Sequence, residues 1–175
     1  ALRGLVARIS GYRETIRRPI RMTETASLMV PVIFSFGEPY SIALGREPGA
    51  GDRIDSFAAG LTSAPALIHS GGGAHCLQVD FTPLGAYRFF GRPMHELAER
   101  MVPLDDLGDP AIAGLGQRLG GQRSWQRRFR LAEAALMPRL LAGSGASPAV
   151  ARAYARIVAT GGAARVADLA GDVAW

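Results

Sequence analysis

In LQVDFTPLGAYRFFG, residues Leu77–Gly91, the spacing of the apolar residues changes from that of a strand to that of a helix. Apolar and polar residues alternate over Leu77–Phe81, which is the pattern of a half-buried strand. Thr82 is a good helix N-cap, Pro83 suits the first helical turn, and Gly91 is typical of a helix end. We therefore predict a β-rich region before this point and helices after it.

The residues before this point predict short antiparallel strands. The apolar and β-branched runs expected to form them are Ala26–Phe36, Tyr40–Leu44, Ile54–Leu61, Ala66–His69 and Leu77–Thr82. Pro31 inside the first run predicts a bulge or an edge position. The triple glycine Gly71–Gly73 predicts a hairpin between the last two strands. Strands of this length and spacing favour an antiparallel sandwich or a small barrel.

The residues after Gly91 predict helices and a second structural unit. The expected helices are Asp109–Leu119, Ser124–Leu141, Ser147–Ala159 and the amphipathic segment Arg165–Trp175. Pro138 should bend or end the second of them. Gly143–Ser147 has the composition of a flexible linker. We therefore predict an α+β protein with a β-rich domain and its helices over residues 1–142, and a separate unit over residues 147–175.

Length and composition favour a folded globular protein. The chain has 175 residues, of which 48% are hydrophobic. Its first residues hold three arginines within ALRGLVARISGYRE and no long apolar segment, so we expect neither a signal peptide nor a membrane span. The single cysteine, Cys76, excludes an internal disulfide framework. These features predict a cytoplasmic protein.

The charges are distributed unevenly along the chain. Residues 1–108 hold eleven arginines and eleven acidic residues, so the whole formal net charge of +5 lies in residues 109–175. A basic excess of this kind suits an acidic partner such as DNA. It is equally compatible with a solvated helix face, which is the interpretation we favour for the arginines around Trp125 and Phe129.

Two segments resemble AraC-type transcriptional regulators. Leu77–Leu107 resembles the junction after the sensor sheet in a subgroup of that family, in which a strand is followed by a Thr-Pro-Leu-Gly-Ala helix and a Gly-x-Pro-x-x-x-Leu segment. Here the matching residues are Thr82, Pro83, Leu84, Gly85, Ala86, Gly91, Pro93 and Leu97. The resemblance implies a cupin-like barrel or sandwich that senses a small molecule or a partner, and a protein that binds double-stranded DNA as a homodimer without a cofactor.

The final helix resembles the first helix of the first helix-turn-helix unit in the same family. Val166, Leu169, Ala170 and Val173 share one face, and the small Ala170 allows a second helix to cross closely. The resemblance assigns Arg165, Val166, Leu169, Ala170, Val173 and Trp175 to a DNA-binding domain. On this basis residues 147–175 are the start of that domain, truncated before its recognition helix.

Ligand-binding candidates lie on the predicted strands. The aromatic residues expected there are Phe34, Phe36, Tyr40, Phe57 and Phe81, and they either line a small-molecule pocket or fill an ordinary core. Gln78 and Asp80 share the strand face opposite Leu77, Val79 and Phe81. They either anchor a ligand or face the solvent. His69 and His75 flank the triple glycine and could face each other across the hairpin.

The sequence contains no set of residues that indicates catalysis or metal binding. The usual cupin metal signature has two histidines one residue apart and a carboxylate shortly after them, and the sequence lacks it. His75 and Cys76 are adjacent on a strand, so their side chains should point to opposite faces and not form a nucleophilic pair. We expect no enzymatic activity, no catalytic residue and no metal. The alternatives are a cupin-like enzyme and a binding module without a DNA role.

The long predicted helix Ser124–Leu141 is the best candidate for part of a dimer contact. Its Trp125, Phe129 and Leu136 face should cover the sheet, while Leu131 and Leu140–Leu141 widen the apolar surface. A wide apolar stripe can pack against a core and a partner together, or entirely within one chain. The sequence leaves both possibilities open.

Overall fold

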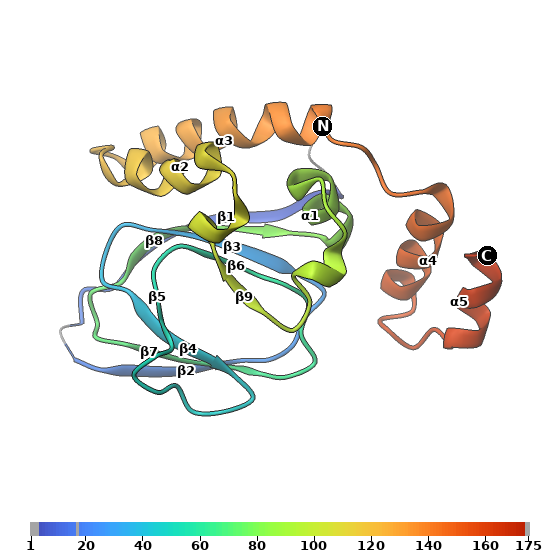
Figure 1. Cartoon of the computed structure of the whole chain (residues 1–175), viewed down its shortest axis with the longest axis horizontal. Coiled ribbons are helices and arrows are strands. Elements are labelled where there is room, and N and C mark those ends of the chain that lie inside the picture. The colour runs from blue at the N-terminus through green and yellow to red at the C-terminus, as the bar shows by residue number, and fades with distance from the viewer. Residues whose placement is uncertain (1–3, 17, 174–175) are drawn as a thin grey trace.

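The computed structural model describes residues 4–16 and 18–173, which form an α+β fold with two antiparallel β-sheets. The five-stranded sheet has the order β1 (Val6–Arg13), β8 (His75–Phe81), β3 (Val30–Ser35), β6 (Phe57–Ala59) and β9 (Met101–Pro103). The four-stranded sheet has the order β2 (Ile20–Glu24), β7 (Ala66–Ser70), β4 (Tyr40–Leu44) and β5 (Arg53–Ile54). The two sheets face each other as a sandwich (Figure 1). Both are open, so the predicted sandwich is the arrangement adopted and the barrel is not.

Three helices cover the outer face of the five-stranded sheet (Figure 1). They are α1 (Pro83–Phe90), α2 (Pro110–Gly120) and α3 (Trp125–Ala142). Two short 3-10 helices, η1 (Met94–Glu96) and η2 (Leu104–Leu107), lie on the connection that also contains β9. None of the helices within residues 4–16 and 18–173 is both long and apolar enough to span a bilayer.

The helices begin and end at residues whose capping chemistry is visible in the sequence. The Thr82 hydroxyl accepts a hydrogen bond from the Gly85 N–H at 3.0 Å, and Gly91 adopts the left-handed conformation (φ 63°) that ends α1. Asp109 and Ser124 cap α2 and α3 in the same way as Thr82 caps α1. These caps confirm the predicted start of each helix.

Helices α4 (Pro148–Ala159) and α5 (Val166–Asp172) pack against each other at the side of the sandwich. An extended segment after Gly143 leads from α3 to α4 (Figure 1). The division into residues 1–142 and 147–175 stays a prediction, and the extended segment lies where the linker was expected.

Two apolar layers stabilise the domain, and they are filled unequally. The layer between the five-stranded sheet and the helices holds nineteen buried residues in one cluster, among them Phe34, Phe81 and Leu136. The layer between the two sheets holds seven, including Tyr40 and Phe57. Burial of apolar area is the main favourable term in folding. The helix–sheet layer therefore buries most of the apolar core, and the inter-sheet layer buries fewer side chains.

The hairpin expected across the triple glycine is wrong. Strand β7 pairs with β2 and β4, whereas β8 pairs with β1 and β3, so Gly71–Gly73 carries the chain from one sheet to the other. Gly72 has a φ of +94°, and a Cβ there would lie 2.5 Å from the Ile16 carbonyl oxygen. The crossover is therefore a close approach of two backbones and not a two-strand turn.

Glu14 forms hydrogen bonds to both sheets near the Gly71–Gly73 crossover. Its side chain is buried and accepts hydrogen bonds from the Ser70 hydroxyl, from the Ala74 N–H at 3.0 Å and from the Tyr12 hydroxyl at 3.2 Å. Ser70 belongs to the four-stranded sheet and Tyr12 to the five-stranded sheet. A buried carboxylate needs such donors, and these donors tie the two sheets together.

Two prolines lie inside regular elements. Pro31 lies in β3, an interior strand, but β6 pairs only with Val32 and Ile33, so Pro31 extends beyond the strand on that side. Pro138 lies inside α3, which continues to Ala142 and does not end at the proline. Strands β1, β2 and β9 were not individually predicted.

Candidate functional site

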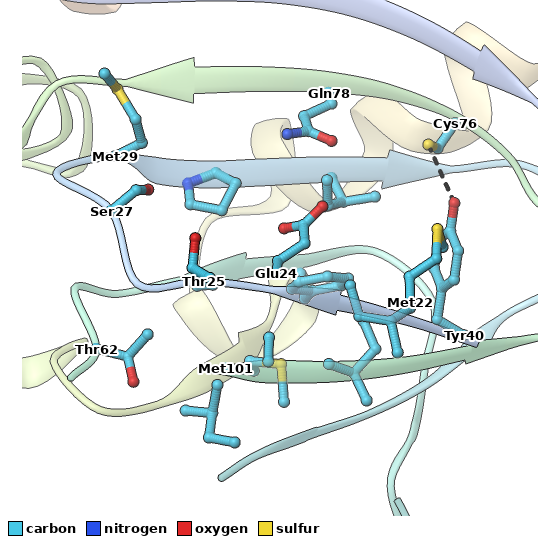
Figure 2. Close-up of a pocket in the computed structure, with 18 of the residues that line it drawn as sticks. Met22, Glu24, Thr25, Ser27, Met29, Tyr40, Thr62, Cys76, Gln78 and Met101 are labelled. Carbon is cyan, nitrogen blue, oxygen red and sulfur yellow. Dashed lines mark hydrogen bonds between the residues drawn. The ribbon is translucent and has the colours of Figure 1, made fainter. Parts of the chain in front are cut away.

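A cavity of about 410 Å³ lies between the two sheets. We call it the inter-sheet cavity. Its apolar wall is formed by residues from both sheets, namely Met22, Ile33, Ile42, Phe57, Ile68 and Met101. Figure 2 shows these strands facing each other across the cavity, with polar side chains gathered toward one side. Volume, concave shape and a mainly apolar lining are typical of small-molecule sites.

Strand alternation decides which side chains face the cavity. On β1 and β8 the inward pairs are Tyr12 with Cys76, Ser10 with Gln78 and Arg8 with Asp80. The outward residues of β8 are His75, Leu77, Val79 and Phe81, of which the last three belong to the helix–sheet layer. One face of β8 therefore packs against the helices, and the other face lines the inter-sheet cavity.

The apolar end of the cavity has its polar atoms satisfied internally. The Tyr40 hydroxyl lies 3.6 Å from the Cys76 Sγ, and both side chains are buried. Burial raises the pKa of the Cys76 thiol, and burial together with the neighbouring Cys76 raises the pKa of Tyr40. Both groups are therefore neutral near pH 7, and Cys76 is a packed thiol and not an activated nucleophile.

The opposite end is polar and open to solvent. Asp80 accepts a hydrogen bond from Arg8 Nε at 2.9 Å and from Gln78 Nε2 at 2.6 Å. The Arg8 side chain is 66% exposed and that of Asp80 only 8%. A hollow of about 340 Å³ adjoins the cavity here and shares Arg8, Glu24 and Gln78 with it. We call this end the mouth.

Four of the predicted ligand-binding residues lie at this site. Tyr40, Phe57 and Gln78 line the inter-sheet cavity, and Asp80 lies at the mouth. Gln78 and Asp80 do share a strand face, and that face is the inner one. Their role as ligand anchors stays a prediction.

The remaining predicted residues lie elsewhere. Phe34 and Phe81 are fully buried between the sheet and the helices, because they occupy the outward positions of β3 and β8. Phe36 and His75 pack together near the start of α3, with ring centroids 4.3 Å apart. His69 lies on the outer face of the four-stranded sheet, where its Nε2 is 2.9 Å from a Glu47 carboxylate oxygen. The two histidines are therefore in different sheets and do not face each other.

An aromatic cluster connects the back of the five-stranded sheet to α3. The Trp125 ring lies 5.2 Å from the His75 ring and 5.9 Å from that of Phe129. The Arg128 guanidinium lies over Phe36 and Trp125, 4.8 and 4.9 Å from their ring centroids. A Cβ on Gly11 would lie 2.3 Å from the Trp125 ring, so only glycine allows this contact. Gly11 also borders the inter-sheet cavity.

Met22, Glu24 and Met101 line the cavity and were missed by sequence reasoning. The alternation of apolar Ile20 and Met22 with polar Arg21 and Thr23 could have indicated β2, although this strand has only five residues. Met101 lies on a three-residue strand, which carries too short a pattern to be found.

The helix assigned to a DNA-binding domain is largely exposed. Val166 is 81% exposed, and Arg165 and Ala170 are exposed as well. Leu169 and Val173 are half-buried, and Arg156 of α4 lies 3.8 Å from the Asp168 carboxylate of α5. Trp175 lies outside the described residues.

Within the described part of the chain, no three histidine, cysteine or carboxylate side chains gather in a way that could hold a metal ion. No protein-family model matches the sequence, and no curated protein or solved structure matches it either.

Proposed function

We propose that the sandwich is a cupin-like sensor that binds a small-molecule effector in the inter-sheet cavity, as part of an AraC-type transcriptional regulator. The observation that carries this proposal is the cavity itself. It is enclosed by both sheets, apolar at one end and polar at the other, and its volume is in the range of ligand sites. The effector, duplex DNA and a second copy of the chain are the proposed partners, and the cytoplasm is the proposed location.

The arrangement of the layers suggests how occupancy would be communicated. Gly11 and Tyr12 border the cavity, and Trp125 of α3 presses on the other side of Gly11. Along the chain, α3 is followed by the extended segment and then by α4 and α5. An effector that favours one position of β1 would therefore favour one position of α3 and shift how the α4–α5 pair is presented.

The chemistry at the cavity supports a binding role over the cupin-like enzyme. The buried thiol and phenol hydrogen-bond each other and are neutral near pH 7. At the mouth Arg8 Nε and Gln78 Nε2 each donate a hydrogen bond to Asp80. These groups can orient a ligand, but none of them is arranged as a nucleophile with its base.

A thermal-shift screen of small molecules, with a cavity-filling variant, tests the proposal. Ala66 of β7 lines the cavity, whereas Ala134 lies on the exposed face of α3. Compounds at about one hundred times their Kd should raise the unfolding temperature of the wild-type chain and of Ala134→Phe, corresponding to roughly 2.7 kcal/mol of stabilisation.

Ala66→Phe should keep its fold, because the added ring enters existing space, and should lose most of this response. Compounds that stabilise Ala66→Phe as strongly as the wild-type chain would bind elsewhere and would contradict the proposed site.

A further inference from the structure

We propose that the effector carries a protonated amine on an apolar body, and that Glu24 is its counter-ion at the mouth of the inter-sheet cavity. This inference rests on the proposed function of the cavity as a ligand site. It adds the chemical class of the ligand and the residue that selects it.

Glu24 occupies an inward position of the four-stranded sheet. Strand β2 alternates, and Met22, two residues before Glu24, packs against the apolar cluster between the sheets. Figure 2 shows the Glu24 side chain extending from β2 into the space between the sheets, on the side where Gln78 lies. Its neighbours in register are Ala66 on β7 and, beyond it, Leu44 on β4. Neither can balance a negative charge.

The charges at the mouth do not cancel. The arginine and carboxylates that line the cavity and the adjoining hollow are Arg8, Glu24 and Asp80. Arg8 is paired with Asp80 at 2.9 Å, and no ion pair or hydrogen bond joins the Glu24 side chain to any of the described residues. The mouth therefore carries one net negative charge, and that charge belongs to a side chain directed toward the ligand space.

The hydrogen-bonding groups at the mouth favour a donor as well as a cation. The Gln78 amide nitrogen donates to Asp80, which leaves its carbonyl oxygen available beside Glu24. An ammonium group has three donors and no acceptor, so it can use a carboxylate and an amide oxygen together. A carboxylate ligand would meet Glu24 as a like charge, and the positive charge of Arg8 is already balanced by Asp80.

The apolar end of the inter-sheet cavity determines which apolar body the ligand can carry. Its walls are methionine, isoleucine and phenylalanine side chains, and the Tyr40–Cys76 contact satisfies its polar atoms. A dry cavity of about 150 Å³ can hold benzene, so the 410 Å³ here suits a body of about two rings. Methionines adapt to irregular shapes, and Met22 and Met101 therefore accommodate a fused aromatic or a branched aliphatic body.

The test compares three probes that share a 1-naphthylmethyl group, namely 1-naphthylmethylamine, 1-naphthylmethanol and 1-naphthaleneacetic acid. Their binding is measured by calorimetric titration at pH 7.5 and low salt. We expect the amine to bind more tightly than the alcohol, and the acid to bind most weakly. Glu24→Gln keeps the shape of the side chain and removes its charge. It should weaken amine binding roughly fivefold to tenfold and leave the alcohol unchanged, as expected for a partly solvated ion pair.

Two further variants complete the design. Glu133→Gln on the exposed face of α3 changes the net charge equally and should leave amine binding unchanged. Arg8→Gln removes the positive charge from the mouth and exposes Asp80, so it should tighten amine binding and weaken acid binding. Opposite effects of Glu24→Gln and Arg8→Gln on one ligand are difficult to obtain from a change in folding.

The outcomes separate the two proposals. Acid binding tighter than amine binding, amine affinity unaffected by Glu24→Gln, or no detectable amine binding would each overturn the amine proposal. If Ala66→Phe abolishes binding of the probes while Glu24→Gln has no effect, the cavity remains the ligand site and only the amine selectivity is wrong. If probe binding is insensitive to Ala66→Phe, the proposed site itself is wrong.

Discussion

His75 packs against the rings of Phe36 and Trp125, and its surroundings disfavour a positive charge. Partial burial lowers its pKa first of all, and Arg128 and Arg13 lower it further. One of these groups, Arg128, places its Nη1 3.5 Å from the His75 Nε2. The neutral imidazole is therefore the form that fits the aromatic cluster formed by Phe36, Trp125 and Phe129.

The protonation of His75 predicts a pH dependence of stability. Because the fold holds the pKa of His75 below that of the unfolded chain, the unfolded chain takes up the proton first as the pH falls through about 6.5. Stability should therefore decline between pH 7.5 and 5.5. We expect His75→Gln to reduce this decline by about 0.5 kcal/mol, a value discounted for solvent screening.

Urea unfolding at the two pH values measures the effect, with His95→Gln as the matched control on an exposed histidine. An equal decline in wild-type, His75→Gln and His95→Gln chains would show that the cluster tolerates the charge.

The candidate site could be predicted from the sequence only in part, and the reason is visible at single residues. Alternation correctly placed Gln78 and Asp80 on one face of β8 and Phe81 on the other. Alternation did not show that both faces of β8 lie inside the protein. The apolar face packs against the helices, and the polar face lines the inter-sheet cavity, which looks in the sequence like a solvent-exposed face. Phe34 was therefore grouped with Tyr40, although the two lie in different layers.

Helix α2 is held at its beginning by one residue with two roles. Asp109 Oδ1 accepts hydrogen bonds from the backbone N–H groups of Ala111 and Ile112, while Oδ2 accepts one from Arg139 of α3. Burial alone raises the pKa of Asp109, but the hydrogen bonds from Arg139 and the helix N-terminus outweigh it and hold the pKa below its usual range. The same carboxylate thus caps one helix and binds the next.

Two substitutions separate these roles. Asp109→Ala removes cap and ion pair and should lower the free energy of unfolding by about 1–2 kcal/mol. Asp109→Asn keeps an oxygen for the cap and should cost about 0.5 kcal/mol. The depressed pKa adds stability above about pH 4 that is lost as the pH falls through the folded-state value, so Asp109→Asn should differ less from wild type at pH 3 than at pH 7.

Chemical denaturation at the two pH values provides the measurement. Equal losses for Asn and Ala at pH 7 would mean that the ion pair with Arg139, and not the cap, carries the contribution.

At the level of elements, local signals succeeded and long-range pairing did not. Thr82, Pro83 and Gly91 act on their immediate neighbours, and α1 has the expected bounds. The partners of β7 and β8 depend on strands up to about seventy residues away, so a turn-like sequence between them was no guide to pairing. Pro138 was expected to bend or end its helix, and α3 does not end there but continues for four more residues.

The excess positive charge of the chain lies outside the proposed ligand site. The net +5 lies in residues 109–175, which include the outer face of α3 and the α4–α5 pair. Leu131 packs against the helix–sheet core, whereas Leu141 is 61% exposed. Leu141 is therefore better placed than Leu131 to take part in the proposed dimer contact.

The resemblance predicts how this chain binds DNA. If α5 is the first helix of a helix-turn-helix unit, residues 1–175 should bind duplex DNA weakly, without sequence preference and with affinity that falls steeply as salt rises, in the roughly 10⁻⁴–10⁻⁶ M range of non-specific binding. Arg152 and Arg165 are exposed on α4 and at the start of α5. Replacing both by Gln should weaken binding more than replacing Arg127 and Arg130 of α3.

Fluorescence anisotropy of labelled duplexes of different sequence, at two salt concentrations, makes the comparison. Sequence-specific binding by these 175 residues, or a loss confined to the α3 double variant, would contradict the assignment of α5.

The contact between Gly11 and Trp125 makes the wall of the cavity only one backbone thick at that point. The indole touches the strand from behind and is not itself among the residues that line the cavity. Because indole emission depends on the packing and polarity around the ring, Trp125 is an intrinsic optical reporter of cavity occupancy. With Trp175→Phe removing the other tryptophan, filling of the space between the sheets can be followed from a side chain that the ligand never touches.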